Sequence, residues 1–493
     1  MASFWMLILI FFPVVLGCVI LFLPEKNRRL FLCMSALTVF ITAGLAWVLI
    51  LNPPGESLTI FKFWDNLVIE FRIDGLSRIF MGLISGLWPL SVIYAFEYMA
   101  HETNPGTLKE RTFFGVYTLT YGVTLGISMA GNLLTMYVFY EMLTLVTIPL
   151  VLFTLTRPAI QATRTYMVFS LGGAAFGFIS LIFLMAYGRG SDFTLGGILD
   201  PSLIGGRANV LRFVYIMGFM GFGVKAAVFP LNSWLPKASV APTPVTALLH
   251  AVAVVKSGAF AIIRLTYYCY GTDFIKGTWA QYIPMGIALF TIIYGCAMAM
   301  KERHFKRRLA YSTTSNLSYV LFAAMLLSPL GLKAALSFMI FHGVMKITAF
   351  FCAGAFLTKG SRVYVYELNG LYREMPFTTT IFTLSALAIM GLPGLPGFAG
   401  KWLIASAAVA DGGVMPVLGV GVLIVSSVLT AVYMLQPVTR IYFHENNGGL
   451  KEASNPGVCM IVPLIILTVA MIFFGLFFTP LTDFIGKVAL GVI

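Results

Sequence analysis

Seven titratable side chains lie in stretches that are otherwise apolar and long enough to cross a membrane. They are Glu141, Lys225, His250, Lys256, His342, Lys346 and Lys401. An ammonium at the centre of a bilayer costs roughly 2.5 to 3.5 kcal/mol on insertion scales, so such a group usually faces a bundle interior or a water-filled path. Buried amines, imidazoles and carboxyls can accept and release protons near neutral pH. These residue types therefore indicate proton transfer inside the membrane.

Prolines surround the first of these lysines. In GVKAAVFPLNSWLPKASVAPTP, Lys225 is followed by Pro230, Pro236, Pro242 and Pro244. Each proline removes an amide donor and interrupts the hydrogen bonding of a helix. Irregular backbone at membrane depth persists only where protein packs around it or a cavity hydrates it. The segment therefore predicts a broken helix beside a wet, titratable site.

A second break precedes Lys401. The run GLPGLPGFAGKW has amide-poor, flexible backbone from Gly391 to Gly397. Corresponding breaks in the two halves of a chain are typical of inverted repeats around a midplane pathway. The repeat is approximate, because Lys225 precedes its break whereas Lys401 follows its own.

The first part of the expected relay is a pair between Glu141 and Lys225. Glu141 has eight or more uncharged residues on either side in LLTMYVFYEMLTLVTIPLVL. Such a pair could share or exchange a proton. The alternative is a static ion pair, which is an expensive way to join two helices that apolar packing would join equally well.

The second part is a set of lysines and histidines. His342 and Lys346 are four residues apart and so lie on one helical face. His250 precedes Lys256 by six residues. The alternative for each histidine is a satisfied buried polar group. We predict that a proton passes from the pair through Lys256 or His250 to the His342/Lys346 region and leaves by way of Lys401.

Three residues are weaker candidates for lining the pathway. Asn316 and Ser312, with Ser315, make a polar patch in LAYSTTSNLSYV that could bind water. Serine and threonine in membrane helices more often bond their own backbone. Lys237, in WLPKAS, is expected at the cytoplasmic end, where its side chain can extend to the interface.

The composition is that of a polytopic membrane protein. Of 493 residues, 59% are hydrophobic and 10% charged, and the mean hydropathy is +0.92. The first apolar stretch, from about Phe4 to Leu23, lacks a basic start, so we expect it to be a retained helix rather than a signal peptide. Apolar stretches predict fourteen spans, centred near residues 14, 41, 88, 121, 143, 176, 220, 255, 289, 318, 345, 390, 425 and 469.

The loops predict how these spans are connected and oriented. Gly131–Leu134 and Pro329–Leu332 are expected to be tight turns, and Asp74, Arg78 and Glu97 interfacial residues of the third span. About 18 basic residues lie on one side of the alternating spans, against about 9 on the other. The basic side comprises PEKNRR, LKER, KERHFKRR and the stretches 157–164, 359–373 and 440–451. We expect a cell (plasma) inner membrane protein with both termini on the non-cytoplasmic side.

The sequence predicts one membrane domain, residues 1–493, without a cofactor. We divide it into N-terminal helices 1–110, a first repeat 111–270, a second repeat 275–442 and a C-terminal helix 443–493. The six cysteines are scattered without a CxxC pair, which argues against a metal or iron–sulfur site. They are Cys18, Cys33, Cys269, Cys296, Cys352 and Cys459. We therefore expect an ion-translocating subunit without a redox centre, and not an enzyme in itself. The net charge of +13 reflects loop topology rather than nucleic-acid binding.

Five motifs in order carry a family resemblance. They are YEMLT, GVKAAVFPLNSWLP, KRRLAYSTTSNLSYVL, FHGVMKITAFFCAG and GLPGLPGFAGKWLI, within roughly residues 74–442. This chain resembles the antiporter-like subunits of the complex I superfamily, which includes membrane subunits of NADH:quinone oxidoreductase, Mrp-type cation/proton antiporters and membrane-bound hydrogenases. The resemblance implies an all-α membrane fold of fourteen helices with two inverted five-helix repeats and two broken helices.

The resemblance also implies residue roles. By position, Glu141 is similar to the family's fifth-helix glutamate, Lys225 to the lysine of its broken seventh helix and Lys401 to the charged residue of its broken twelfth helix. The remaining lysines and histidines resemble the connecting relay. Some subtypes have glutamate in place of Lys401, and the largest subtype has a long C-terminal lateral helix that this sequence lacks.

The subtype remains open between two kinds of complex. KAAVFPL…WLP and Lys256 are most similar to the D-type component of Mrp antiporters, whereas His250 and Asn316 fit that subtype less well. A respiratory complex I-like or membrane-bound hydrogenase complex is the alternative. In either case the expected partners are other membrane subunits, H+ and possibly Na+. A solute carrier and a membrane scaffold are further alternatives, although we find no recognition groups for an organic solute.

Overall fold

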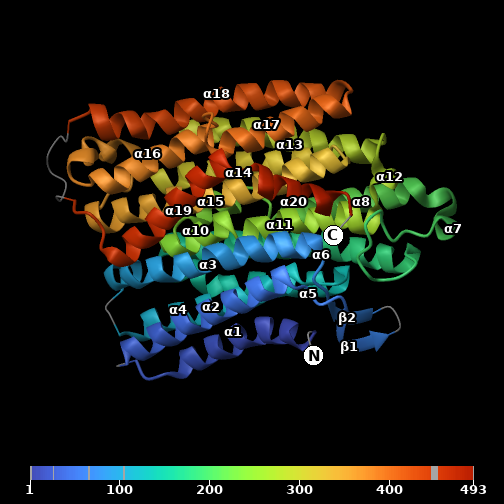
Figure 1. Ribbon diagram of the computed structural model, residues 1–493, viewed down its shortest axis with the longest axis horizontal. Coiled ribbons are helices and arrows are strands. Elements are labelled where there is room, and N and C mark those ends of the chain that lie inside the picture. The colour runs from blue at the N-terminus through green and yellow to red at the C-terminus, as the bar shows by residue number, and fades with distance from the viewer. Residues whose placement is uncertain (1–2, 26, 65–66, 104–105, 446–452, 492–493) are drawn as a thin grey trace.

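A computed structural model describes residues 3–25, 27–64, 67–103, 106–445 and 453–491. It is a bundle of helices that run roughly along the long axis of the molecule (Figure 1). Lys26 and residues 446–452, which belong to two of the predicted basic loops, lie outside the described residues, as do 1–2 and 492–493 at the termini.

Ten segments of the described chain are long and apolar enough to cross a membrane. They are α1 (Phe4–Phe22), α2 (Arg28–Leu51), α3 (Gly75–Glu102), α5 (Leu133–Val151), α6 (Arg157–Tyr187), the stretch Thr243–Tyr270, α13 (Trp279–Lys301), α15 (Pro329–Gly360), α18 (Val414–Phe443) and α19 (Val458–Leu476). The chain thus has a mainly helical, multi-pass membrane fold.

The other helices are shorter or more polar. They are α4 (Leu108–Ser128), α7 (Pro201–Ile204), α8 (Ala208–Gly223), α9 (Trp234–Ala238), α12 (Thr272–Ile275), α14 (Phe305–Ala324), α16 (Pro376–Met390), α17 (Pro396–Asp411) and α20 (Thr479–Ala489). Thr243–Tyr270 consists of α10 (Thr243–Ala251), α11 (Val254–Ile263) and the π-helix η2 (Arg264–Tyr270). Short 3₁₀ turns are η1 (Gly205–Arg207), η3 (Val365–Leu368) and η4 (Leu371–Arg373). Each of the fourteen predicted centres falls within a helix.

The structure corrects the all-α prediction at one place. β1 (Leu58–Trp64) and β2 (Leu67–Phe71) pair antiparallel, with register irregularities after Thr59 and Lys62. The hairpin projects from the end of the bundle at which the chain begins (Figure 1). Its strands are rich in the aromatic and β-branched residues that strands favour.

One predicted turn is misplaced. Pro329–Leu332 forms the first turn of α15, and residues 325–328 make the connection instead. Proline suits the first position of a helix, because its missing N–H would have no intrahelical partner there. At the other joint, Asn132 caps α5 by accepting from the Thr135 amide at 2.8 Å, so only residues 129–132 connect α4 to α5.

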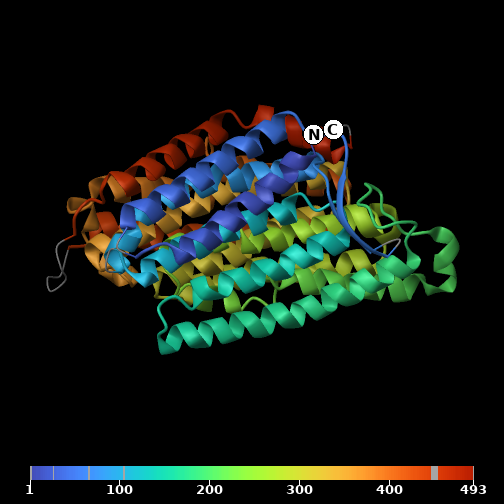
Figure 2. The ribbon, with the colours of Figure 1, turned by 90° about the horizontal axis from the view of Figure 1, so that it is seen from below.

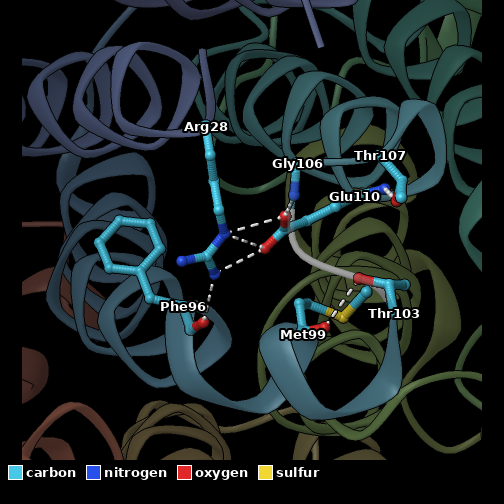
Figure 3. A network of polar contacts seen from close by, with 7 residues as sticks. All are labelled: Arg28, Phe96, Met99, Thr103, Gly106, Thr107 and Glu110. Carbon is cyan, nitrogen blue, oxygen red and sulfur yellow. Dashed lines mark hydrogen bonds and ion pairs between the residues drawn. The ribbon is translucent and has the colours of Figure 1, made fainter. Parts of the chain in front are cut away.

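A buried carboxylate ties the N-terminal helices together (Figure 3). Glu110 of α4 accepts from Arg28 Nη2 of α2 at 2.7 Å and from the Gly106 amide at 2.7 Å. Arg28 Nη2 also lies 3.4 Å from the Phe96 carbonyl of α3. The ion pair therefore joins α2, α3 and α4 at one end of the bundle.

Four of the seven predicted titratable residues lie on the innermost helices. Thr243–Tyr270 is wholly buried and α15 almost so, whereas α1 and α18 are largely exposed. Figure 1 shows α18 and α1 at opposite edges of the molecule, with α10, α11 and α15 between them. The titratable groups predicted from sequence thus form a row of which Lys225, His250, Lys256, His342 and Lys346 are fully buried, whereas Glu141 and Lys401 at its ends are half-buried.

Candidate functional site

The centre of this row is a contact between Lys256 and His342. Lys256 of α11 and His342 of α15 are both fully buried, and Lys256 Nζ lies 2.6 Å from His342 Nδ1. The same ammonium donates to the His250 carbonyl at 3.1 Å. Nε2 of His342 has no hydrogen-bond partner among the described residues. The arrangement can pass a proton between an amine and an imidazole of two different helices.

A helix break that the sequence analysis missed makes this contact possible. Val252 and Ala253 separate α10 from α11, and their amides both donate to the Leu248 carbonyl, at 2.9 and 2.8 Å. The His250 carbonyl is thereby available to Lys256. This interruption was not predicted, because HAVAVVKSG contains no proline to signal it.

His250 is surrounded by amines. Its buried ring stacks on Phe350 at 4.7 Å between centroids, and neither ring nitrogen has a partner among the described residues. Lys256, Lys346 and Lys306 are each close enough to interact electrostatically with it. Lys346 donates to the Leu309 carbonyl of α14 at 3.1 Å. The structure thus brings four of the predicted residues, His250, Lys256, His342 and Lys346, into one buried cluster.

Lys306 also lies near His250, although the sequence analysis does not single it out. KERHFKRR was interpreted as a loop, but Phe305–Arg308 is the first turn of α14. The Lys306 side chain is buried and donates from Nζ to the Ala241 carbonyl at 2.8 Å. Ala241 immediately precedes Pro242, in the connection between α9 and α10. Within a run of basic residues, nothing marked this one as inward-facing.

Lys225 lies in the turn that follows α8. It is fully buried, and Nζ donates to the Tyr140 carbonyl and lies 3.4 Å from the Tyr140 ring centroid. Glu141 follows Tyr140 in α5, and its buried Oε1 has no hydrogen-bond partner among the described residues. No ion pair within 4.0 Å joins Glu141 to Lys225 in the described chain, although the two interact electrostatically. The predicted pair is therefore close but separated in this structure.

A glycine brings Lys225 against the central helix. A Cβ on Gly258 of α11 would overlap the Ala226 amide and lie 2.9 and 3.0 Å from the Lys225 carbonyl carbon and Cβ. Gly258 is two residues from Lys256, so the close approach connects the turn at Lys225 to the Lys256 segment. No hydrogen bond joins the two lysines within the described residues.

Lys401 lies in the second turn of α17, after the predicted break. Its Nζ donates to the carbonyls of Met390 and Ile389 at 2.8 and 3.3 Å and to Ser427 Oγ at 3.2 Å. Gly391 ends α16 with φ of +95°, and a Cβ there would lie 3.4 Å from Nζ. The break therefore exposes the carbonyls that hold the ammonium, and glycine leaves room for it.

A network of hydroxyls and one thiol lies between Lys401 and Asn316. Tyr319 donates to Ser426 at 2.7 Å, and Tyr433 donates to Ser312 at 2.8 Å. Cys296 Sγ lies 3.2 Å from Ser315 Oγ. The Asn316 amide donates to the Ser312 carbonyl at 2.7 Å, while its Oδ1 has no partner within the described chain. Ser312 and Asn316 thus belong to a connected polar region of α13, α14 and α18.

Other predicted residues lie away from the central row. Lys237 is exposed in α9 and lines a surface hollow with Glu302 and Arg307. Glu97 pairs with Lys359 at 2.9 Å. Asp74, expected at the interface, caps α3 and forms an ion pair with the fully buried Arg264 of η2 at 2.5 Å.

Comparison with known proteins identifies the family of this fold and site. The family profile described as "NADH:quinone oxidoreductase/Mrp antiporter, TM" matches residues 130–430. The profile "NADH-Ubiquinone oxidoreductase (complex I), chain 5 N-terminus" matches residues 65–107.

Curated relatives and a solved structure agree with these matches. NADH-quinone oxidoreductase subunit N of Desulforudis audaxviator is 28% identical over 422 residues, covering 83% of this chain and 82% of the relative. NADH-quinone oxidoreductase subunit L of Mycobacterium tuberculosis is 29% identical over 462 residues, which cover 90% of this chain and 70% of the relative. A chain of the Mrp complex from Dietzia sp. DQ12-45-1b superposes with a TM-score of 0.86 at 19% identity. The superposition covers 99% of this chain and 97% of the Mrp chain. This chain therefore belongs to the transmembrane family of NADH:quinone oxidoreductase and Mrp antiporter subunits.

Proposed function

We propose that this chain translocates protons through its buried row of glutamate, lysine and histidine, as the D-type component of an Mrp-type cation/proton antiporter. The observation that supports this most is the 2.6 Å contact between Lys256 and His342, because it joins titratable groups of two fully buried segments. A scaffold would have little use for amines at such depth, since burying them is costly.

The proposed path takes the buried groups in their order along the bundle, with Lys256–His342 as its direct contact. Glu141 and Lys225 hold a proton at one end, Lys256 with His250 and His342 passes it on, and Lys346 connects to Lys401. Hydration along the row would link groups that are not in direct contact, and the Ser312 to Ser426 network would hold water near Lys401. A change of charge at Lys225 alters the field at the next site, so events in partner subunits can drive transfer electrostatically.

We also propose the finer topology that the resemblance implies. The chain would span the membrane fourteen times, with α8 and α9 forming one broken span and α16 and α17 another. Residues 111–270 and 275–442 would be two inverted repeats. The termini would lie on the non-cytoplasmic side of the plasma membrane.

Proton flux with variant complexes tests the relay. Glu141→Gln and Lys225→Met should each abolish proton-coupled transport by the purified complex in proteoliposomes while its subunits still assemble. Lys276→Met is the matched control, because Lys276 is exposed and pairs with Asp411 at 3.2 Å. Transport at the control level in both test variants would contradict the relay and favour a scaffold.

A respiratory or hydrogenase complex is the second candidate. The identity of 28% and 29% to quinone oxidoreductase subunits N and L favours it. Proteoliposomes separate the two: an imposed Na+ gradient should move protons through an antiporter without electron donors. Proton movement that requires NADH, or hydrogen as donor, would instead assign the chain to a redox-driven complex.

A further inference from the structure

An apolar hollow of the described surface lies away from the proton row. It is a groove of about 410 Å³ between α2, α3, α15, α19 and α20. Figure 1 shows α3, α19 and α20 on the side of the bundle that faces the viewer. The wall of the groove is almost entirely aliphatic and aromatic, and Arg78 is the only charged residue among the described residues that line it.

Helix α3 forms the floor of this groove. Arg78, Gly82, Gly86 and Leu90 recur every four residues and are the partly exposed positions of α3 between residues 75 and 92. A Cβ on Gly86 would meet nothing within 4 Å, whereas one on Gly82 would lie 3.7 Å from the Trp47 ring, so Gly86 opens space that nothing in the described chain fills. From Arg78 to Leu90 the floor is about 18 Å long at 1.5 Å per residue, close to the ~15 Å thickness of one hydrocarbon leaflet.

The single cation is held at one end. Arg78 Nε donates to the Ile50 carbonyl at 2.8 Å, and its guanidinium carbon lies 5.0 Å from the centre of the Phe484 ring of α20. Its two terminal nitrogens have no hydrogen-bond partner among the described residues. Trp47, 45% exposed in the last turn of α2, lines the same groove. A tryptophan and an arginine near helix ends are typical of headgroup depth.

We propose that the groove binds one membrane phospholipid, with an acyl chain along Gly82 and Gly86 and the phosphate on Arg78. A planar guanidinium with free terminal N–H groups suits a phosphate oxyanion. A single acyl chain is narrow enough to lie between the side chains of α2, α3 and α19 that line the groove. The lipid belongs to the leaflet beside the chain termini and would cover the seam between α3 and α19. The proposal does not depend on proton translocation.

A photoreactive lipid tests this proposal. Phosphatidylglycerol with a diazirine at the end of one acyl chain is added to the delipidated complex, and cross-linked peptides are identified by mass spectrometry. We expect cross-links on α3 and α19 near Leu90 and Ala470. Gly86→Leu, which fills the groove, should abolish them. Arg78→Gln should reduce them roughly tenfold at limiting lipid, the effect of losing one charge-assisted hydrogen bond.

Controls separate the site from general lipid contact. Gly44→Leu adds the same side chain to an exposed glycine of α2 that also has open space, and should leave the cross-links unchanged. Gly82→Val provides a second, smaller filling variant. A diacylglycerol probe lacks the phosphate. It should label the wild type no more strongly than phosphatidylglycerol labels Arg78→Gln. Equal labelling by both probes, full labelling of Gly86→Leu, or cross-links from α3 to a neighbouring subunit in place of lipid would overturn the proposal.

Discussion

At the scale of single residues, Lys256 is the group on which the proposed relay depends most. Lys256→Met keeps much of the side-chain volume but removes the contacts to His342 and the His250 carbonyl. General acid–base groups contribute roughly 100-fold or more to the steps they serve, so proton flux should fall by about that factor. Lys333→Met, on the same helix as His342 but paired with Asp483 near the surface, is the control. Normal flux in Lys256→Met would remove this residue from the path.

The ion pair of Asp74 with Arg264 predicts a stability effect that depends on pH. Desolvation would raise the pKa of Asp74, which precedes α3, but the Arg264 guanidinium outweighs it and holds the pKa at about 2, below the ordinary 3.8. The pair therefore stabilises the fold fully above pH 4 and loses this contribution as the pH falls towards 2. Asp74→Asn should cost about 3 to 5 kcal/mol at neutral pH, because it leaves a buried guanidinium unpaired.

Thermal unfolding in detergent measures this effect. The midpoint of Asp74→Asn should lie well below that of wild type at pH 7, and the gap should narrow between pH 4 and pH 3. A gap that is constant over this range would mean that the ionised Asp74–Arg264 pair is not the cause, since asparagine can still accept from the Ser77 amide as Asp74 does at 2.9 Å.

At the scale of elements, close helix packing positions the titratable groups. Gly258→Ala changes no charge, yet its methyl group would press α11 away from the turn that carries Lys225. Overpacking of this kind costs about 1 to 3 kcal/mol. We expect a lower unfolding temperature together with reduced proton flux. Gly421→Ala in α18, where a methyl group meets open space, should change neither. Wild-type flux in a destabilised Gly258→Ala would show that spacing at Lys225 does not limit transfer.

Element-level prediction from sequence succeeded where composition or proline marks a boundary. Hydropathy located the helices, and the prolines located the breaks at Lys225 and Lys401. The break at Val252 and Ala253 has no such mark, since neither proline nor a polar cluster precedes it in HAVAVV. The same holds for Arg264: its partner Asp74 is 190 residues away, and only the tertiary fold brings the two together. The direction in which Lys306 points was likewise hidden within a basic run.

At the scale of the whole molecule, the ends of the bundle differ in charge. The described ends of the chain lie at the same end of the bundle as the β1–β2 hairpin (Figure 1 and Figure 2). Helices that run back and forth then place the Arg28, Lys109, Arg157 and Arg440 regions at the opposite end. The long polar connection that contains α7 lies at the end with the hairpin. The surplus of basic residues at one end predicts that this end faces the cytoplasm.

Cysteine labelling tests this orientation. In a variant whose six native cysteines are replaced by serine, Lys109→Cys and Ser202→Cys each place one thiol at an exposed position, at opposite ends of the bundle. A membrane-impermeant maleimide should label Ser202→Cys in intact cells, and Lys109→Cys only in inside-out vesicles. The reverse pattern would invert the proposed topology and place the basic end of the bundle outside the cytoplasm.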